Sequence, residues 1–391
     1  MDTGRTCLQK YQRLIDMKYC LSCLQPDSRP GTYFANGICP ACEFRLTSTS
    51  WDWQNRKRIL REVVTSLKSR NHVSGHDSIL GVSGGKDSTR LALFARDSLG
   101  LNPLLVVVTY PPEQMTVIGA RNLDNLIQLG FDVYQTSPSP TTWKSLMKAS
   151  FLESANWAKS TELALFSGVP QIAIENGIGL ILWGENPGLQ LGALETLGKE
   201  GWDGNSLRNM NTLSGLDRDW LQRHNIDISH VGPYLYPTPS EFEFHNVQII
   251  FLGWAMKNWG LFENGLSAGL AGLQSRTDSP SNTSDLLNLT SLDEDWVVLN
   301  QMIKYYKFGF GRATDYVNEW IRTGRITRAE GIPLIEKYDG ACADKYIESF
   351  SEFIGVSVAE FWRTVRRFTS TDYFDVSGSG RPKPLFKVGQ I

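Results

Sequence analysis

The feature of this chain that most constrains its fold is a glycine-rich turn between an apolar run and a helical segment. Residues 79–82 form the apolar run, residues 82–88 read Val-Ser-Gly-Gly-Lys-Asp-Ser, and residues 88–99 have the spacing of an amphipathic helix. A strand, a glycine-rich turn and a helix in this order aim backbone N–H groups at a helix N-terminus, where anions bind. The stretch therefore predicts a phosphate site at the end of a β-strand.

Further apolar runs follow at wide intervals, with helical patterns between them. The predicted strands are 79–82, 104–109, 131–134 and 178–183, with an additional strand around 247–252. The predicted helices are 51–70, 88–99, 115–129 and 156–176, the last broken into two pieces at residues 168–170 by Gly-Val-Pro. Apolar strands that alternate with helices predict an α/β fold with a parallel sheet covered on both faces. Such Rossmann-like sheets bind ligands at the carboxyl ends of their strands.

The composition is that of an ordinary soluble globular protein, with 41% hydrophobic and 20% charged residues. Because the formal net charge is only −2, neither nucleic acid nor an anionic membrane is an expected partner. No apolar stretch has membrane-spanning length, and residues 1–20 lack the apolar core of a signal peptide. We expect a cytoplasmic enzyme.

Four of the six cysteines have the spacing of a zinc knuckle. Cys20, Cys23, Cys39 and Cys42 form a C-x2-C-x15-C-x2-C pattern, while Cys7 and Cys342 lie outside it. Because all four ligand positions are cysteine, none is open for substrate, and the ion is expected to be structural. Its expected role is to pin the N-terminal arm to the main domain. An iron–sulfur cluster and four unrelated buried thiols are the alternatives.

The chain divides into three predicted parts. They are the four-cysteine zinc-knuckle arm (1–50), an α/β domain with a polar insertion that begins near residue 188 (51–290), and a helical C-terminal subdomain with a tail (291–391). Three capping boxes predict helix starts in the last part: Ser291 with Glu294, Thr327 with Glu330, and Ser357 with Glu360.

The glycine-rich loop differs from a Walker P-loop, which needs G-x-x-x-x-G-K-[ST]. Leu80 stands where the first glycine should be, and Asp87 follows the lysine. The predicted binding residues are those of the loop and the first helical turn: Val82, Ser83, Gly84, Gly85, Lys86, Asp87 and Ser88. Backbone N–H groups and Lys86 suit phosphate, whereas a carboxylate repels it unless a cation lies between them. Asp87 therefore predicts a bound Mg²⁺. The alternative is a glycine turn that binds nothing.

The Ser-Gly-Gly-Lys-Asp-Ser motif resembles the PP-loop of the ATP pyrophosphatases, which split ATP into AMP and pyrophosphate. The segments that extend the resemblance over nearly the whole chain are YCLSCLQPDSRPGTYFANGICPAC (19–42), GVSGGKDSTR (81–90), LILWGENP (180–187), DGNSLRNMNT (203–212) and SLDEDWVVLNQMIKYYKFGFGRATDYVNEWIR (291–322). Together they look like the N-acetyl sugar amidotransferases of bacterial surface-sugar biosynthesis, which includes O-antigen biosynthesis.

This resemblance implies an adenine nucleotide alpha hydrolase-like PP-loop domain in residues 51–290, with ATP, Mg²⁺ and Zn²⁺ as cofactors. The implied reaction turns an acetamido group of an amino sugar into an acetamidino group. Attack of the amide oxygen on the α-phosphorus of ATP makes an adenylated imidate, and ammonia then expels AMP. Such an enzyme must mainly stabilise charge on the departing pyrophosphate.

Further candidate residues follow from this chemistry. Lys307 or Arg312, in or just after a basic helix end, is predicted to reach the phosphates; a solvated helix end is the alternative. Gly184 and Glu185 follow the fourth strand beside the loop, and Glu185 could bind Mg²⁺, act on ammonium, or merely cap a turn. Polar residues suited to a sugar lie after residue 202, with a hydrogen-bonded loop as the alternative: Asp203, Asn205, Arg208 and Asn209.

Ammonia is expected to come from outside the chain. Residue 2 is Asp2, and neither Cys7 nor Cys342 lies in a glutaminase-like context. The resemblance implies a separate glutaminase subunit, similar to that of imidazole-glycerol-phosphate synthase, and a companion barrel protein. Two rival functions are a PP-loop tRNA thiolase, which would need a basic face and further cysteines, and a non-catalytic ATP-binding scaffold.

Overall fold

A five-stranded parallel sheet forms the centre of the protein. The computed structural model describes residues 17–68, 75–184, 201–209 and 218–390. The strand order is β3-β2-β1-β4-β5, and every neighbouring pair is parallel. The strands are β1 (Ser78–Gly81), β2 (Pro103–Val108), β3 (Val133–Thr136), β4 (Leu180–Trp183) and β5 (Gln248–Phe251). All five lie within two residues of their predicted starts, so the predicted α/β fold is confirmed.

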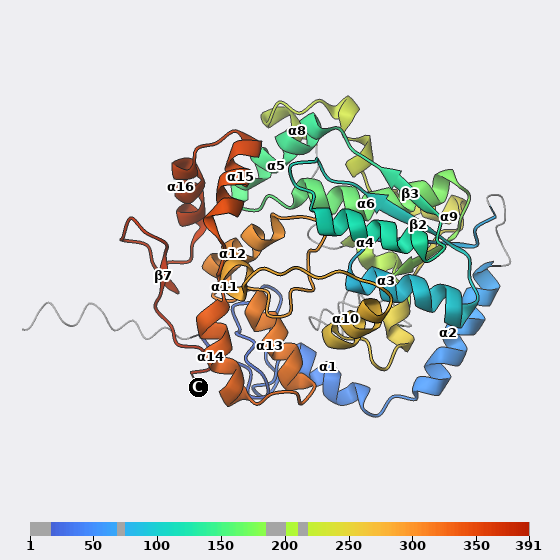
Figure 1. Ribbon diagram of the computed structural model, residues 1–391, viewed down its shortest axis with the longest axis horizontal. Coiled ribbons are helices and arrows are strands. Elements are labelled where there is room, and N and C mark those ends of the chain that lie inside the picture. Colours follow the sequence, from blue (N-terminus) through green and yellow to red (C-terminus); the bar gives the residue numbers. More distant parts are fainter. Residues whose placement is uncertain (1–16, 69–74, 185–200, 210–217, 391) are drawn as a thin grey trace, which may run out of the picture.

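Helices cover both faces of this sheet, because successive strand residues point to opposite sides. Leu80, Leu105 and Leu182 pack against α2 (Trp53–Lys68), α3 (Lys86–Leu93) and α4 (Val117–Gln128). Figure 1 shows α3 and α4 side by side over the strands. Ile79 and Ile181 point the other way and pack against α6 (Lys159–Glu175) and α9 (Pro239–Phe244).

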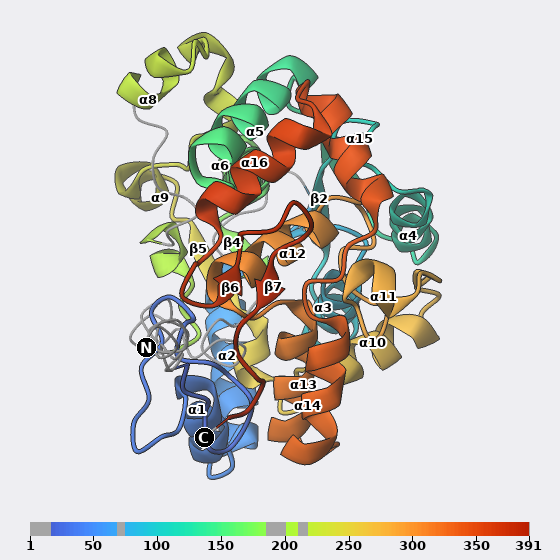
Figure 2. The ribbon, with the colours of Figure 1, turned by 90° about the vertical axis from the view of Figure 1, so that its left-hand side faces the viewer.

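The chain after β5 is largely helical, as predicted for the part from residue 291 onward. Its helices are α10 (Leu261–Leu270), α11 (Pro280–Thr283), α12 (Val297–Phe308), α13 (Arg312–Arg322), α14 (Arg328–Tyr338), α15 (Asp344–Ile354) and α16 (Val358–Phe368). α15 and α16 pack on α5 (Pro140–Ser154), where Phe151 stacks on Phe361 with ring centroids 5.2 Å apart. Figure 2 shows α16 beside α5 and α6. A short hairpin of β6 (Phe374–Asp375) and β7 (Lys383–Pro384) follows.

The N-terminal arm, residues 17–48, lies against α13 and α14 (Figures 1 and 2). It ends in α1 (Pro40–Ser48). Leu24 is fully buried among Val317 and Ile335, and its N–H donates to the Asn318 side chain at 2.7 Å. The arm therefore has an apolar anchor as well as its cysteines.

Two local predictions were wrong. α6 is not broken at residues 168–170 but continues through Pro170, because Val169, Ile172 and Ala173 bury their side chains against the sheet. Ser291 and Glu294 do not form a capping box. Ser291 has a φ of 50°, and Glu294 accepts the N–H groups of Trp296 and Val297, so that α12 begins later. The Thr327–Glu330 box is confirmed with both of its hydrogen bonds.

Candidate active site

The glycine-rich loop leaves β1 where the strand order changes direction. β1 has β2 on one side and β4 on the other, so the loop lies at the switch point of the sheet. Val82 continues the strand ladder, since its N–H donates to the Val106 carbonyl at 2.8 Å. Gly84 then turns the chain with φ +74°, and a Cβ there would lie 3.1 Å from the Leu123 nitrogen. Both the left-handed conformation and the close packing require glycine at this position.

Lys86 opens α3 and contacts the carboxylate that follows it. Its Nζ lies 2.7 Å from Oδ2 of Asp87. The other oxygen, Oδ1, accepts a hydrogen bond from Nδ2 of Asn264 in α10 at 2.5 Å. Asn264 is 1% exposed and accepts in turn from the Arg90 guanidinium. The Asp87 carboxylate thus has a fixed orientation, held by a lysine and a buried amide.

A cavity of about 340 Å³ opens in front of this loop. One wall is made by the loop and the first turn of α3: Ser83, Gly85, Lys86, Asp87 and Ser88. Residues 289–293 and one face of α13 form the opposite wall. The cavity therefore lies between the α/β sheet and the helical C-terminal part.

The face of α13 that lines the cavity carries both signs of charge. Its residues are Arg312, Asp315, Tyr316, Glu319 and Arg322, whose spacing puts them on one side of the helix. Arg312, predicted to reach the phosphates, thus lies on the cavity wall, where its Nη2 is 3.4 Å from the Ser291 hydroxyl.

Two carboxylates on this face have opposite pKa shifts. Burial alone would raise the pKa of Asp315, but ion pairs with Lys304 (2.7 Å) and Arg29 outweigh it and hold that pKa below its ordinary value. For Glu319 burial dominates and raises the pKa, although the carboxylate accepts the Leu261 N–H at 2.6 Å and lies near Lys86. One wall of the cavity thus holds a firmly ionised carboxylate and one that is more easily protonated.

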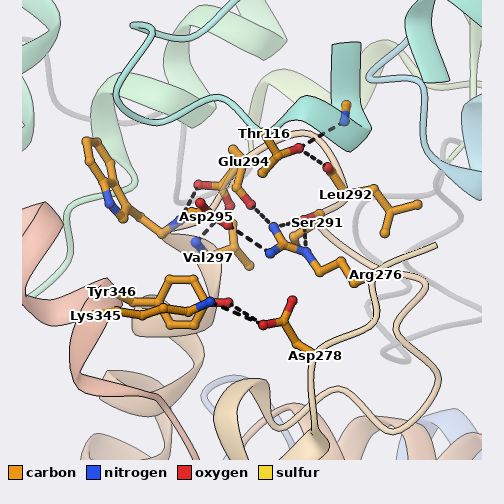
Figure 3. Close-up of polar contacts among 12 residues, drawn as sticks. Thr116, Arg276, Asp278, Ser291, Leu292, Glu294, Asp295, Val297, Lys345 and Tyr346 are labelled. Atoms are coloured by element: carbon orange, nitrogen blue, oxygen red, sulfur yellow. Dashed lines mark hydrogen bonds and ion pairs between the residues drawn. The ribbon is translucent and has the colours of Figure 1, made fainter. Parts of the chain in front are cut away.

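Hydrogen bonds from the buried Arg276 hold the segment 289–296 in place (Figure 3). The Arg276 guanidinium donates to the Ser291 carbonyl at 2.7 and 3.1 Å, to the Glu294 carbonyl at 2.5 Å and to the Asp295 carboxylate at 2.8 Å. Asp278 nearby pairs with Lys345 of α15 at 3.2 Å. The wall is therefore held in place by contacts that do not involve the cavity.

The same segment is joined to the start of α4. The Thr116 N–H donates to the Asp293 carbonyl at 3.1 Å, and its hydroxyl donates to the Leu292 carbonyl. A Cβ on Gly119 would lie 2.4 Å from Cα of Asp293. Glycine at 119 therefore allows the backbones of α4 and the C-terminal part to touch.

A second cavity of about 300 Å³ lies beside the first, at the carboxyl ends of β2 and β3. Ser83 and Asp293 line both cavities. The rest of its lining is mainly apolar and comes from β2 and α4, with Val107, Tyr110 and Leu123 among its residues. The Tyr110 hydroxyl donates to the Asp293 carboxylate at 2.8 Å.

The four knuckle cysteines gather in one buried cluster. Their sulfur atoms lie within 4.8 Å of one another, and all four side chains are buried. The N–H groups of Cys39 and Gln25 donate to the sulfurs of Cys20 and Cys23 at 3.2 and 3.4 Å. Such a cluster can hold zinc or an iron–sulfur cluster, and the predicted grouping of these cysteines is confirmed.

Several predicted site residues are not brought to the cavity. Lys307 does not line it: its Nζ donates to the Ser154 carbonyl of α5 at 2.9 Å. Gly184 packs against Leu91 of α3, where a Cβ would lie 2.2 Å from Cδ1, and does not line the cavity. Glu185 lies outside the described residues.

The residues predicted to bind the sugar do not line this cavity either. Asp203 and Asn205 extend the edge of the sheet: Asp203 accepts from the Gln248 side chain at 2.8 Å, and Asn205 accepts the Ile249 N–H at 2.9 Å. Arg208 lies over the Phe242 ring at 4.6 Å. Asn209 ends the 3₁₀ helix Asn205–Asn209. Asp203, Asn205 and Arg208 thus make contacts within the fold, while Asn205 and Arg208 also line a separate pocket beside β5.

The structure adds residues that the sequence reasoning missed. Asn264 lies in α10, which has no motif, and only its contact with Asp87 reveals it. Asp315, Glu319 and Arg322 could have been found from their helical spacing after Arg312, since a charged face on a half-buried helix has few structural explanations.

The fold and the site together define an α/β protein with a loop that suits phosphate. A parallel sheet, a glycine-rich loop at its switch point and a Lys-Asp pair at the start of the next helix are its features. Residues 289–383 match the family model described as "LPS biosynthesis protein WbpG-like, C-terminal domain". This segment is therefore similar to the C-terminal domain of those proteins, and it begins at the cavity wall.

Three solved structures are among those similar to this chain. The NH3-dependent NAD synthetase of Campylobacter jejuni is 14% identical, with 59% of this chain and 100% of that chain covered and a TM-score of 0.28. The NMN synthetase of Francisella tularensis is 13% identical (58% and 90% covered, TM-score 0.28). The U34-tRNA thiolase NcsA of Methanococcus maripaludis, solved with its [4Fe-4S] cluster, is 13% identical (70% and 79% covered, TM-score 0.31). No curated protein matches the chain.

None of the helices in the described ranges is long and apolar enough to cross a membrane.

Proposed function

We propose that this protein uses ATP to convert an acetamido group of a bacterial surface sugar into an acetamidino group. The observation that carries the proposal is the shared cavity, since the glycine-rich loop forms one wall and the WbpG-like domain forms the other. A loop of this kind suits ATP, and a domain of lipopolysaccharide biosynthesis suits a sugar. The two substrates would meet in one site.

ATP would span both cavities. The triphosphate lies along residues 83–88, where the loop N–H groups and Lys86 offset its charge. The nucleoside enters the second cavity, whose apolar lining from β2 and α4 suits a purine ring. Ser83 and Asp293, which line both cavities, would then flank the α-phosphate, where the bond is broken.

The sugar would occupy the α13 side of the first cavity. Tyr316, Thr290 and Gln301 offer hydroxyl and amide groups there, and Arg312 offers a cation. The acetamido oxygen attacks the α-phosphorus, and pyrophosphate leaves. Ammonia then adds to the imidate carbon, and AMP leaves with the former amide oxygen. Lys86 and Arg312 would stabilise the negative charge that develops on the phosphates.

Metal ions fit this scheme at two places. Asp87 would hold Mg²⁺, which neutralises phosphate charge when it is bound. In the cysteine cluster we propose zinc, because a tetrahedral ion with bonds of about 2.3 Å keeps its sulfurs about 3.8 Å apart. The sulfurs of Cys23 and Cys39 are 3.7 Å apart.

Ammonia would come from a separate glutaminase, resembling that of imidazole-glycerol-phosphate synthase and accompanied by a barrel protein. Among the described cysteines outside the cluster, Cys342 is 3% exposed, and burial raises its pKa to about 12. A thiol in that state is a poor nucleophile at neutral pH.

The test is AMP release by the purified protein with ATP, Mg²⁺ and ammonium, over a panel of di-N-acetylated sugars and their nucleotide-linked forms. We expect release that requires one sugar and ammonium, with the matching amidine in the mass spectrum. Release that requires bulk tRNA and a sulfur donor would instead establish a thiolase. ATP binding without AMP formation under any of these conditions would leave a non-catalytic scaffold.

A further inference from the structure

Helix α13 separates the cavity from the cysteine cluster and contacts both. The face described above lines the cavity, whereas Val317, Asn318 and Ile321 face the N-terminal arm. Ile321 packs against the cysteines themselves, and Asn318 accepts the Leu24 N–H. A displacement of the arm would therefore move a wall of the cavity.

Arg322, in the last turn of α13, takes part in both sites. It lines the cavity, and its Nη2 lies 3.8 Å from the sulfur of Cys23. Glu319, one turn earlier, interacts through its charge with both Lys86 and Arg322. Arg322 therefore lines the same cavity as Lys86 of the glycine-rich loop.

A second link runs from the arm to the same helix. The Arg29 guanidinium pairs with Asp315, which lines the cavity, and lies over the Phe310 ring at 4.4 Å. The Ser28 hydroxyl donates to the Phe308 carbonyl at 2.5 Å. The arm thus contacts two charged residues of the cavity wall, one at each end of α13.

We propose that Arg322 binds the pyrophosphate part of ATP and that the metal-loaded cysteine cluster holds its guanidinium in the binding orientation. The proposal rests on the proposed use of ATP in this cavity. Four thiolates around one divalent ion carry a net charge of about −2, which attracts a neighbouring guanidinium. Without the ion, the sulfur of Cys23 would no longer be held in a fixed position beside Arg322. Metal loading would therefore control anion affinity as well as stability.

The first experiment measures binding of inorganic pyrophosphate by titration calorimetry, with the metal content determined on the same samples. We compare the wild type, Arg322→Gln, Arg322→Lys and Arg328→Gln. Arg328 is a matched control, because its guanidinium donates to the carbonyls of Cys20 and Cys23 but does not line the cavity.

At equal metal loading, we expect Arg322→Gln to bind pyrophosphate about tenfold or more weakly, which is typical for the loss of one charge-assisted contact. Arg322→Lys should lie between it and the wild type, and Arg328→Gln should match the wild type. Equal affinity of metal-loaded Arg322→Gln and wild type would overturn the role of Arg322. A wild type that binds neither ATP nor pyrophosphate would overturn the proposed function itself.

A second measurement begins with the wild type. In wild-type protein loaded with Co²⁺, pyrophosphate should shift the thiolate-to-cobalt absorption, because Arg322 changes its contact with Cys23 when it takes up the anion. In Arg322→Lys the shift should be smaller. A wild-type spectrum that is unchanged at saturating pyrophosphate would contradict the link between the two sites.

Discussion

The side-chain amide of Asn264 donates a hydrogen bond to Asp87 at 2.5 Å, from a position that is 1% exposed. It joins α10 to the glycine-rich loop, which is far away in sequence. The amide oxygen of Asn264 accepts from Arg90. The amide nitrogen, which can only donate, must therefore be the atom that faces Asp87. The carboxylate proposed to hold Mg²⁺ therefore depends on a residue outside every motif.

Replacing this donor should misplace Asp87. In Asn264→Asp a second carboxylate faces Asp87 and repels it, so we expect AMP formation to fall about 100-fold, a loss of about 3 kcal/mol. Asn264→Ala should lose less, because it removes the bond without adding charge. Steady-state kinetics against Mg²⁺ concentration measure the effect, and activity equal to that of the wild type in both variants would contradict it.

Lys86→Ala and Asp87→Ala should each abolish AMP release and leave the fold intact. In the proposed function Lys86 offsets phosphate charge and Asp87 holds the cation. Circular dichroism and the melting temperature check the fold, and coupled detection of pyrophosphate checks turnover. Arg363→Gln, which changes an exposed cation on α16, is the control. Normal turnover by both loop variants would place the active site elsewhere.

Gly119→Ala should separate α4 from the C-terminal part. The added Cβ would lie 2.4 Å from Cα of Asp293, and backbone cannot move aside as a side chain can. We expect a stability loss of about 1–3 kcal/mol and weaker nucleoside binding. Gly269→Ala in α10 is the comparison site, because this glycine is also helical and nothing lies within 4 Å of the added Cβ. Adenosine binding that is equal in wild type and Gly119→Ala would argue against the nucleoside site.

Removal of one cluster cysteine should release the metal and loosen the N-terminal arm. In Cys39→Ser we expect less than one metal ion per chain and a melting temperature lower by several degrees. Cys342→Ser, which changes a buried thiol outside the cluster, should keep its metal. Elemental analysis with thermal melting tests this, and full metal content in Cys39→Ser would disprove the four-cysteine site.

Stability should depend on pH through Glu294. Burial, and then repulsion by Asp293, raises the pKa of this carboxyl to about 8 from an ordinary value of 4.5. The folded state thus binds more protons than the unfolded state between these values, so the contribution of Glu294 is complete below about pH 4.5 and is lost as pH rises through 8.

Glu294→Gln removes this titration. It should flatten the dependence of unfolding free energy on pH from about 5 to 8, measured by urea denaturation. The variant should be less stable overall, because one amide oxygen replaces two carboxylate oxygens that accept from Gln114, Trp296 and Val297. A slope equal to that of the wild type would show that Glu294 is ionised throughout this range.

The sequence was sufficient for the sheet, the loop and the cysteine cluster, because each depends on local patterns. Apolar runs locate strands such as β2, the motif locates Lys86 and Asp87, and cysteine spacing locates the cluster. A helix such as α5 was missed, because apolar residues surround it and give little periodicity.

The rest of the site depends on contacts between distant segments. Lys304 and Lys307 lie about one turn apart on α12, so the sequence does not show which of them faces α13. In the structure Lys304 contacts Asp315 of α13, and Lys307 contacts α5. Asn205 looked suited to a sugar, but its amide is used at the edge of β5. A loop can be rich in the same polar residues whether they hydrogen-bond within the protein or bind a ligand, so the sequence does not distinguish the two cases.

The most direct test of the account follows the acetamido oxygen. With the sugar that supports turnover, labelled with ¹⁸O in that acetamido group, the proposed adenylation transfers the label to AMP. Mass spectrometry of the products should therefore find one ¹⁸O in AMP for each amidine formed, and none in pyrophosphate. If AMP is released without ¹⁸O while the sugar keeps its label, activation of the acetamido group by this site is contradicted.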